Sequence, residues 1–161
     1  MKNTLELLDV DGNYTFTGLR LSQKGISKLK LREINLSSSV EEINLDHMKD
    51  TLVSLKTYNP IDLSELKLKK LHISKPTQLV KNISLNHSHM NKSLEFLIIE
   101  KSKYINQYIN MNDIHTLNLK YLIVTDPTIN MNLQKKTIFI KCSKNELNKM
   151  IEKISKLLSI R

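Results

Sequence analysis

The stretch Leu66-Lys67-Leu68-Lys69-Lys70-Leu71-His72-Ile73 carries the apolar spacing L-x-L-x-x-L-x-I. The full spacing returns at residues 29–36 and 117–124, and its second half returns at residues 40–45, 80–85 and 94–99. Such recurrence is typical of repeat proteins, in which each short unit buries an apolar face against its neighbours. The sequence therefore predicts a small repeat architecture.

The composition fits one folded domain. Hydrophobic residues make up 40% and charged residues 25% of the 161 residues, which is typical of a globular chain rather than a disordered one. There is no Trp and there are only three Phe, so we expect an aliphatic core. Cys142 is the only cysteine, which excludes an intrachain disulfide and favours a cytoplasmic location. No apolar run approaches the ~20 residues of a membrane span.

Charge is distributed unevenly along the chain. Residues 1–66 hold 8 basic and 10 acidic side chains, a net charge of −2. Residues 67–161 hold 17 basic and 6 acidic side chains, a net charge of +11. A basic half of this kind attracts polyanions, although a solvated lysine-rich surface gives the same pattern.

Both ends of the chain differ from its middle. Alternating runs flank Asp11-Gly12-Asn13, a strong hairpin signal, so residues 1–28 are predicted to form a capping hairpin. Residues 143–161 change to a helical period, with Ser143 and Glu146 spaced as in a capping box. We expect this amphipathic helix to cap the last strand; a position on a membrane surface is the alternative.

The repeats occupy residues 29–142, and each is expected to give one strand to a parallel sheet. The middle apolar residues of the main strands are expected at Ile34, Leu55, Leu71, Leu97, Leu122 and Ile138. The steps between them vary from 16 to 26 residues, so the repeats are irregular.

The run from Leu31 to Ile43 reads L-x-x-I-x-L, then a Ser-rich turn, then V-x-x-I, and similar runs follow at 68–83, 94–99 and 119–127. This order resembles the BspA-like class of leucine-rich repeats over residues 29–141. The resemblance implies a protein-interaction scaffold without an active site. The expected fold is thus β-rich α+β: a short, irregular leucine-rich-repeat-like solenoid with an N-terminal hairpin cap and a C-terminal helix cap.

No residue pattern for catalysis, a metal or a cofactor is present. His87 and His89 lack a Cys or carboxylate at ligand spacing, and surface histidines in a turn are the preferred interpretation. By residue type, Cys142 and His115 suit a nucleophile and its base, but the sequence does not place them together. The preferred interpretation of Cys142 is a small, buried or semi-exposed thiol without a catalytic role. Three glycines hardly suffice for a phosphate loop.

One predicted surface stands out. In a strand read as L-x-x-L-x-I the intervening residues face away from the core. In the first half we expect these to be ordinary polar, solvent-facing residues: Glu33, Asn35, Ser54, Lys56, Lys70 and His72. In the second half they form an apolar patch with a lysine rim: Phe96, Ile98, Tyr121, Ile123 and Phe139, flanked by Lys101, Lys103, Lys120 and Lys141. Such a patch indicates a partner, unless the C-terminal helix covers it.

The leading hypothesis is a non-enzymatic module that binds another protein through this sheet face; an inhibitor or immunity-type protein fits the profile. The alternative is nonspecific nucleic-acid binding by the lysine-rich half. Arginine, which suits base reading, occurs only at 20, 32 and 161, so such binding would be phosphate-dominated. A fragment of a secreted protein and an enzyme are the remaining alternatives.

Overall fold

A computed structural model describes residues 5–10, 23–37, 40, 43–58, 61–74, 83–86, 88–102, 109–131, 133 and 136–159, with the side chains of 88 and 157–159 set aside. The predicted hairpin turn at 11–13 lies outside these residues. Seven strands form one sheet: β1 (Leu7–Asp9), β2 (Glu33–Asn35), β3 (Ser54–Thr57), β4 (Lys70–Ile73), β5 (Phe96–Ile99), β6 (Tyr121–Val124) and β7 (Ile138–Lys141).

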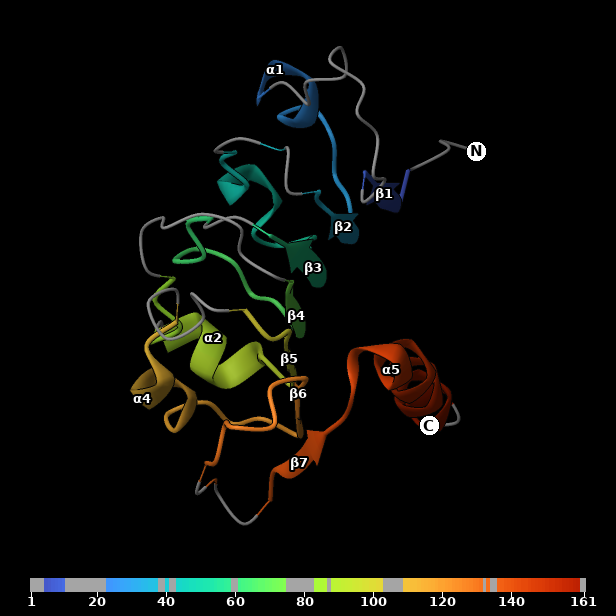
Figure 1. Cartoon of the computed structure of the whole chain (residues 1–161). Coiled ribbons are helices and arrows are strands. Elements are labelled where there is room, and N and C mark those ends of the chain that lie inside the picture. Colours follow the sequence, from blue (N-terminus) through green and yellow to red (C-terminus); the bar gives the residue numbers. More distant parts are fainter. Residues whose placement is uncertain are drawn as a thin grey trace.

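Every neighbouring pair of strands is parallel, and the spatial order is the order of the sequence, β1 to β7. In Figure 1 the strands therefore follow one another down the molecule. Short helical segments lie on one side of the sheet: α1 (Gln23–Ile26), the 3-10 turn η1 (Asp46–Met48), α2 (Ser88–Ser93) and α4 (Met111–Ile114). The long helix α5 (Lys144–Ser159) lies on the other side.

The same backbone junction recurs at the start of five strands. The carbonyl of the residue directly before one strand accepts two hydrogen bonds from the next strand. The donors are the N–H groups of that strand's first residue and of the residue before it. Arg32 accepts from Val53 and Ser54, for example, and Glu95 accepts from Lys120 and Tyr121. At β7 only Ile138 donates to the Lys120 carbonyl, and the Thr137 hydroxyl donates to the Leu119 carbonyl instead. A repeated junction keeps successive strands in register.

The register confirms five of the six predicted strand centres. One row of buried residues runs across the sheet without a break, because each strand places its central apolar residue beside the next: Ile34, Leu55, Leu71, Leu97 and Leu122. Leu8 of β1 continues this row at one end. The prediction for β7 is wrong by one residue, since Phe139 and not Ile138 pairs with Leu122.

The main core lies between the sheet and the helical segments. It combines the inward strand residues with residues of the connections, such as Ile26, Met48, Met90 and Ile114, which are all at most 1% exposed. Its members are almost entirely Leu and Ile, as the composition predicts. Ile83 and Ile109, which lie in the connections between strands, are also buried in this core and form an isolated parallel bridge.

Truncation of the central row is expected to destabilise the whole stack. Leu97→Ala removes a fully buried side chain from β5 and should lower the free energy of unfolding by about 2–5 kcal/mol. Lys67→Ala is the control, because it breaks only the exposed 2.7 Å ion pair with Asp50, and solvent-exposed ion pairs contribute little to stability. Urea unfolding of both variants checks this; equal losses would contradict the assigned core.

Candidate functional site

Four of the five apolar residues of the expected patch lie together on the sheet face opposite the main core. Phe96 pairs with Tyr121 and Ile98 pairs with Ile123 across β5 and β6, so the four side chains are contiguous. The Phe96 and Tyr121 rings stack with centroids 5.1 Å apart and planes 9° from parallel. Strand alternation turns these residues away from the main core.

Helix α5 covers the centre of this patch. Ile98 and Ile123 are each 1% exposed, because they pack with Leu147 and Ile154 of α5, which are 3% and 5% exposed. Phe96, Tyr121, Met150 and Ile151 complete the cluster as partly buried members. The alternative weighed from the sequence, coverage by the C-terminal helix, is thus the arrangement observed. The sequence predicts that this helix caps the last strand, but in the structure it packs on the sheet face instead.

Phe139 does not belong to the patch, so its predicted place on that sheet face is wrong. Its side chain packs against the main core, and Ile140 contributes to the α5 cluster instead. The run Ile138-Phe139-Ile140 is apolar at three successive positions, so alternation alone does not decide which residue faces inward. Backbone pairing with β6 decides it.

The three described rim lysines engage groups of their own chain. The Lys120 ammonium lies 2.7 Å from a Glu95 carboxylate oxygen, and the Lys101 ammonium lies 3.8 Å from Asp126. Lys141 donates to Asn130 Oδ1 at 2.7 Å and to the Pro127 carbonyl at 3.2 Å. Its partner in the sheet is the core residue Val124, so Lys141 points to the core side of β7, away from the patch. Lys103, the fourth predicted rim lysine, lies outside the described residues.

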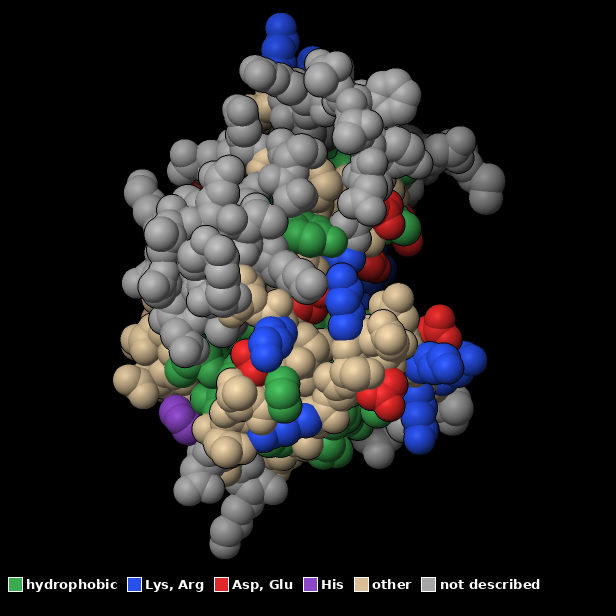
Figure 2. All heavy atoms as spheres, in the orientation of Figure 1, with side chains coloured by type: hydrophobic (Ala, Val, Ile, Leu, Met, Phe, Trp, Pro, Cys, Tyr) green, Lys and Arg blue, Asp and Glu red, His purple; other side chains and the backbone are tan. Residues whose placement is uncertain are grey.

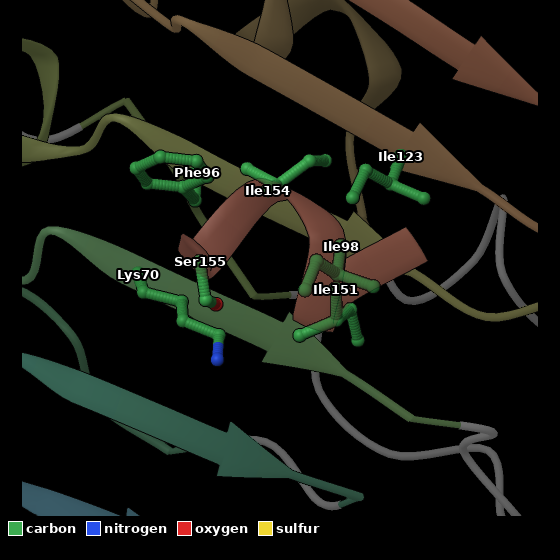
Figure 3. A pocket seen from close by; sticks show the side chains of 7 residues that line it. All are labelled: Lys70, Phe96, Ile98, Ile123, Ile151, Ile154 and Ser155. Carbon is green, nitrogen blue, oxygen red and sulfur yellow. The ribbon is translucent and has the colours of Figure 1, made fainter. Parts of the chain in front are cut away.

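A cavity remains between α5 and the sheet. Its volume is about 70 Å³, and its lining is apolar except for the Lys70 and Ser155 side chains: Lys70, Phe96, Ile98, Ile123, Ile151, Ile154 and Ser155. Figure 3 shows the Lys70 side chain extending beside Ser155, with Phe96 and the isoleucines around them. Lys70 was expected to be an ordinary solvent-facing residue, and the structure places it in this site.

Local sequence explains why α5 is a helix. The Glu146 carboxylate accepts hydrogen bonds from the Ser143 N–H at 2.9 Å and the Ser143 hydroxyl at 2.6 Å, which confirms the predicted pairing at the helix start. These bonds hold the pKa of Glu146 below its usual value. Basic side chains such as Lys149 and Lys153 are exposed, and Figure 2 shows charged side chains gathered at the position of α5.

Packing holds α5 on the sheet. Nearly complete burial of Leu147 and Ile154 stabilises this contact by roughly 3–6 kcal/mol before the entropy of ordering the helix is subtracted. The main core buries many more aliphatic side chains. The contact of α5 is therefore the weaker of the two apolar clusters.

A buried polar cluster adjoins the patch at the ends of β4 and β5. His72 Nε2 lies 2.9 Å from Glu100 Oε1, and the Ser74 hydroxyl donates to the same oxygen at 2.7 Å. The three residues are at most 7% exposed. His72 was expected to face solvent, and that expectation is wrong, because Glu100 continues the face of β5 beyond Ile98 and gives the imidazole a partner.

Electrostatics give this cluster a defined protonation state. Burial lowers the pKa of His72, although the hydrogen bond with Glu100 acts in the opposite direction. Burial raises the pKa of Glu100, but the hydrogen bonds from His72 and Ser74 outweigh it and bring that pKa to about 2. At neutral pH a neutral imidazole therefore donates its Nε2–H to an ionised carboxylate.

The cluster contains the residue types of a serine-hydrolase triad but not its geometry. In a triad the serine and the carboxylate bind different nitrogens of the imidazole. Here Ser74 lies 3.4 Å from the same Nε2 that binds Glu100. Cys142 is not activated either, since burial and the charge of Glu146 raise the pKa of its thiol. These groups fit a structural role.

Further features bear on binding chemistry. Within the described part of the chain, no group of three or more His, Cys, Asp or Glu side chains is arranged to hold a metal ion. No helix among the described residues has both the length and the apolar character to cross a bilayer. His89 is exposed in α2, whereas His87 lies outside the described residues.

Comparisons with models of protein families, with curated proteins and with solved structures give no match to this chain. The site residues that the sequence did not reveal are Lys70, His72, Ser74 and Glu100. They become apparent only from the register of β4 against β5. This register places the side chains of Ser74 and Glu100 next to each other, although the two residues are 26 positions apart in the sequence.

The polar cluster predicts acid-sensitive stability. The pKa of His72 is lower in the folded chain than its value of 6.5 in a free chain, so the free energy of unfolding should fall below about pH 6.5. The loss is at most about 1.4 kcal/mol per pH unit. The Glu100 pKa of about 2 against 4.5 adds a second loss as the pH falls from 4.5 toward 2.

Urea unfolding between pH 7.5 and 5 measures the first effect. His72→Gln should remove the loss in that range, and His89→Gln, at an exposed histidine of α2, should retain it. A wild-type stability that rises between pH 6.5 and 5 would contradict the assigned protonation state.

Proposed function

We propose that this chain is a non-enzymatic protein-binding module, built as a short, irregular leucine-rich-repeat-like solenoid of the BspA-like kind. The arrangement of one parallel strand per turn, with strands in sequence order, supports the solenoid. In this proposal residues 1–28 form an N-terminal hairpin cap that contributes β1 to the sheet, residues 29–142 form the rest of the stack, and residues 143–161 form the helix that covers the apolar sheet face. The single cysteine agrees with a cytoplasmic location.

One observation carries the proposal: the contiguous apolar surface of Phe96, Ile98, Tyr121 and Ile123 lies on the sheet face opposite the main core. This surface takes no part in the main core, which is formed by the residues on the other face of the sheet and by the connections. Stacked aromatic side chains beside aliphatic ones are the usual anchors of protein interfaces. Phe96 and Tyr121 keep part of their surface exposed beside α5, where a partner makes its first contact.

An inhibitor or immunity-type role fits such a module, because its action would consist of occupying a partner's surface. The second candidate is nonspecific nucleic-acid binding by the basic half, favoured by the net charge of +11 over residues 67–161 and by the exposed lysines of α5. That binding would weaken by orders of magnitude with added salt, since it rests on phosphate neutralisation. An apolar interface would not weaken in this way.

Capture from a lysate of the native cell, with and without nuclease, separates the two candidates. We expect a protein that is retained after nuclease treatment and in 0.5 M salt. The Phe96→Ala and Tyr121→Ala double variant should lose at least tenfold in affinity for that protein, as expected for interface anchors. Lys92→Ala, an exposed residue of α2 on the opposite side, is the matched control and should bind normally.

Two outcomes would contradict the protein-binding proposal. Complete loss of retained material on nuclease treatment would make the basic half the functional surface. Unchanged affinity of a folded double variant would place the interface elsewhere.

A further inference from the structure

Helix α5 shows which kind of ligand the apolar sheet face accepts. We propose that the face of β4, β5 and β6 is a groove for an amphipathic helix of a partner protein, that α5 occupies this groove when the partner is absent, and that the partner helix carries an acidic side chain opposite Lys70. This inference rests on the proposed protein-binding function and names the partner's chemistry.

The packing of α5 shows which apolar side chains a helix needs in order to bind this groove. Its groove-facing residues are Leu147, Met150, Ile151 and Ile154, which follow the spacing i, i+3, i+4, i+7. This spacing is the anchor pattern of helices that bind in grooves. The groove supplies the opposite surface with Ile98 and Ile123 at its centre and the stacked Phe96 and Tyr121 beside them. A partner helix with the same pattern would bury the same surface.

The fit of α5 is also incomplete. The cavity of about 70 Å³ lies where Ile151, Ile154 and Ser155 meet the sheet, so α5 leaves room that a longer side chain would fill. Ser155 is the residue next to Lys70 in this cavity (Figure 3), and its short hydroxyl side chain carries no charge. A glutamate at this place would extend toward the Lys70 ammonium and occupy the space.

Charge favours a different occupant over α5. Lys70 makes no ion pair among the described residues, whereas Lys101 and Lys120 have acidic neighbours. Helix α5 itself has four lysines and two glutamates over residues 144–159, a net charge of +2, and the other residues of 67–161 hold 13 basic and 4 acidic side chains, a net charge of +9. Lys144 of α5 interacts favourably with the Glu100 carboxylate, but α5 places the uncharged Ser155, and no acid, beside Lys70. An occupant with an acidic side chain at this place is therefore favoured over α5.

The connection makes α5 a tethered competitor. Only Cys142 and Ser143 separate β7 from α5, so the helix stays close to its groove after release. A tethered ligand acts at a high effective concentration and reduces the apparent affinity of any free competitor. The wild-type chain should therefore bind a free helix weakly, and a chain whose own helix is released should bind it strongly.

A peptide assay on the full chain tests this directly. The probes are fluorescein-labelled peptides of residues 144–159, one with the native sequence and one with Ser155→Glu. Fluorescence anisotropy then gives the affinity of each chain variant. Ile154→Asp in the chain should release α5, because it puts a charge into the apolar cluster. It should raise the affinity for both peptides at least tenfold over wild type.

The controls match this change. Asn148→Asp introduces the same charge at an exposed position of the same helix and should bind as weakly as wild type. In the Ile154→Asp chain the Ser155→Glu peptide should bind about tenfold more tightly than the native peptide, and adding Lys70→Ala should abolish this preference. Ser155→Glu in an otherwise native chain should lower the affinity for either peptide, since it holds α5 in place.

Each negative result has a defined meaning. A folded Ile154→Asp chain, verified by a cooperative urea transition, that binds no better than Asn148→Asp would overturn the groove. Equal binding of the two peptides would overturn the role of Lys70. Should Ile154→Asp fail to fold, Met150→Asp at the partly buried edge of the cluster carries the same test. Peptide binding without any cellular protein partner would leave the groove standing and would reject only the proposed function.

Discussion

Backbone hydrogen bonds between consecutive parallel strands are the constraint on which every other contact in this molecule depends. Each strand pairs with the next strand of the chain, and the pairing continues without offset from Leu8 through Phe139. Because side chains alternate between the two faces, this single register decides which residues enter the aliphatic core and which face α5. A shift of one residue in any strand would exchange the two sets.

The two faces of the sheet are closed by different means. The connections between strands close one face, since they return along the same side and contribute Ile26, Met48 and Met90 to the core. On the other face no connection between strands among the described residues contributes to the apolar cluster, and the apolar part is covered by α5, a separate element after β7. Closure of the first face is thus built into the stack. Closure of the second face depends on α5 alone, which is joined to β7 through Cys142 and Ser143.

The polar cluster of His72, Ser74 and Glu100 marks the boundary of the apolar face. A buried carboxylate is costly unless hydrogen bonds compensate for its lost hydration, and here the imidazole and the hydroxyl provide them. Ion pairing is not required, because the imidazole stays neutral at neutral pH. The cluster joins two turns of the stack by side-chain hydrogen bonds, in addition to the backbone hydrogen bonds between their strands. This structural role explains why the cluster is buried.

The sequence by itself determined the parallel strands, the centres of five of them, the aliphatic core, a C-terminal helix within residues 143–161 and four contiguous patch residues, Phe96, Ile98, Tyr121 and Ile123. Periodicity reveals these features because each depends on residues close together in the chain. Only the tertiary structure decided that α5 covers the patch, that Phe139 turns inward and that His72 meets Glu100. These depend on contacts between distant segments and, at β7, on a run of three apolar residues whose alternation is ambiguous until the neighbouring strand fixes its register.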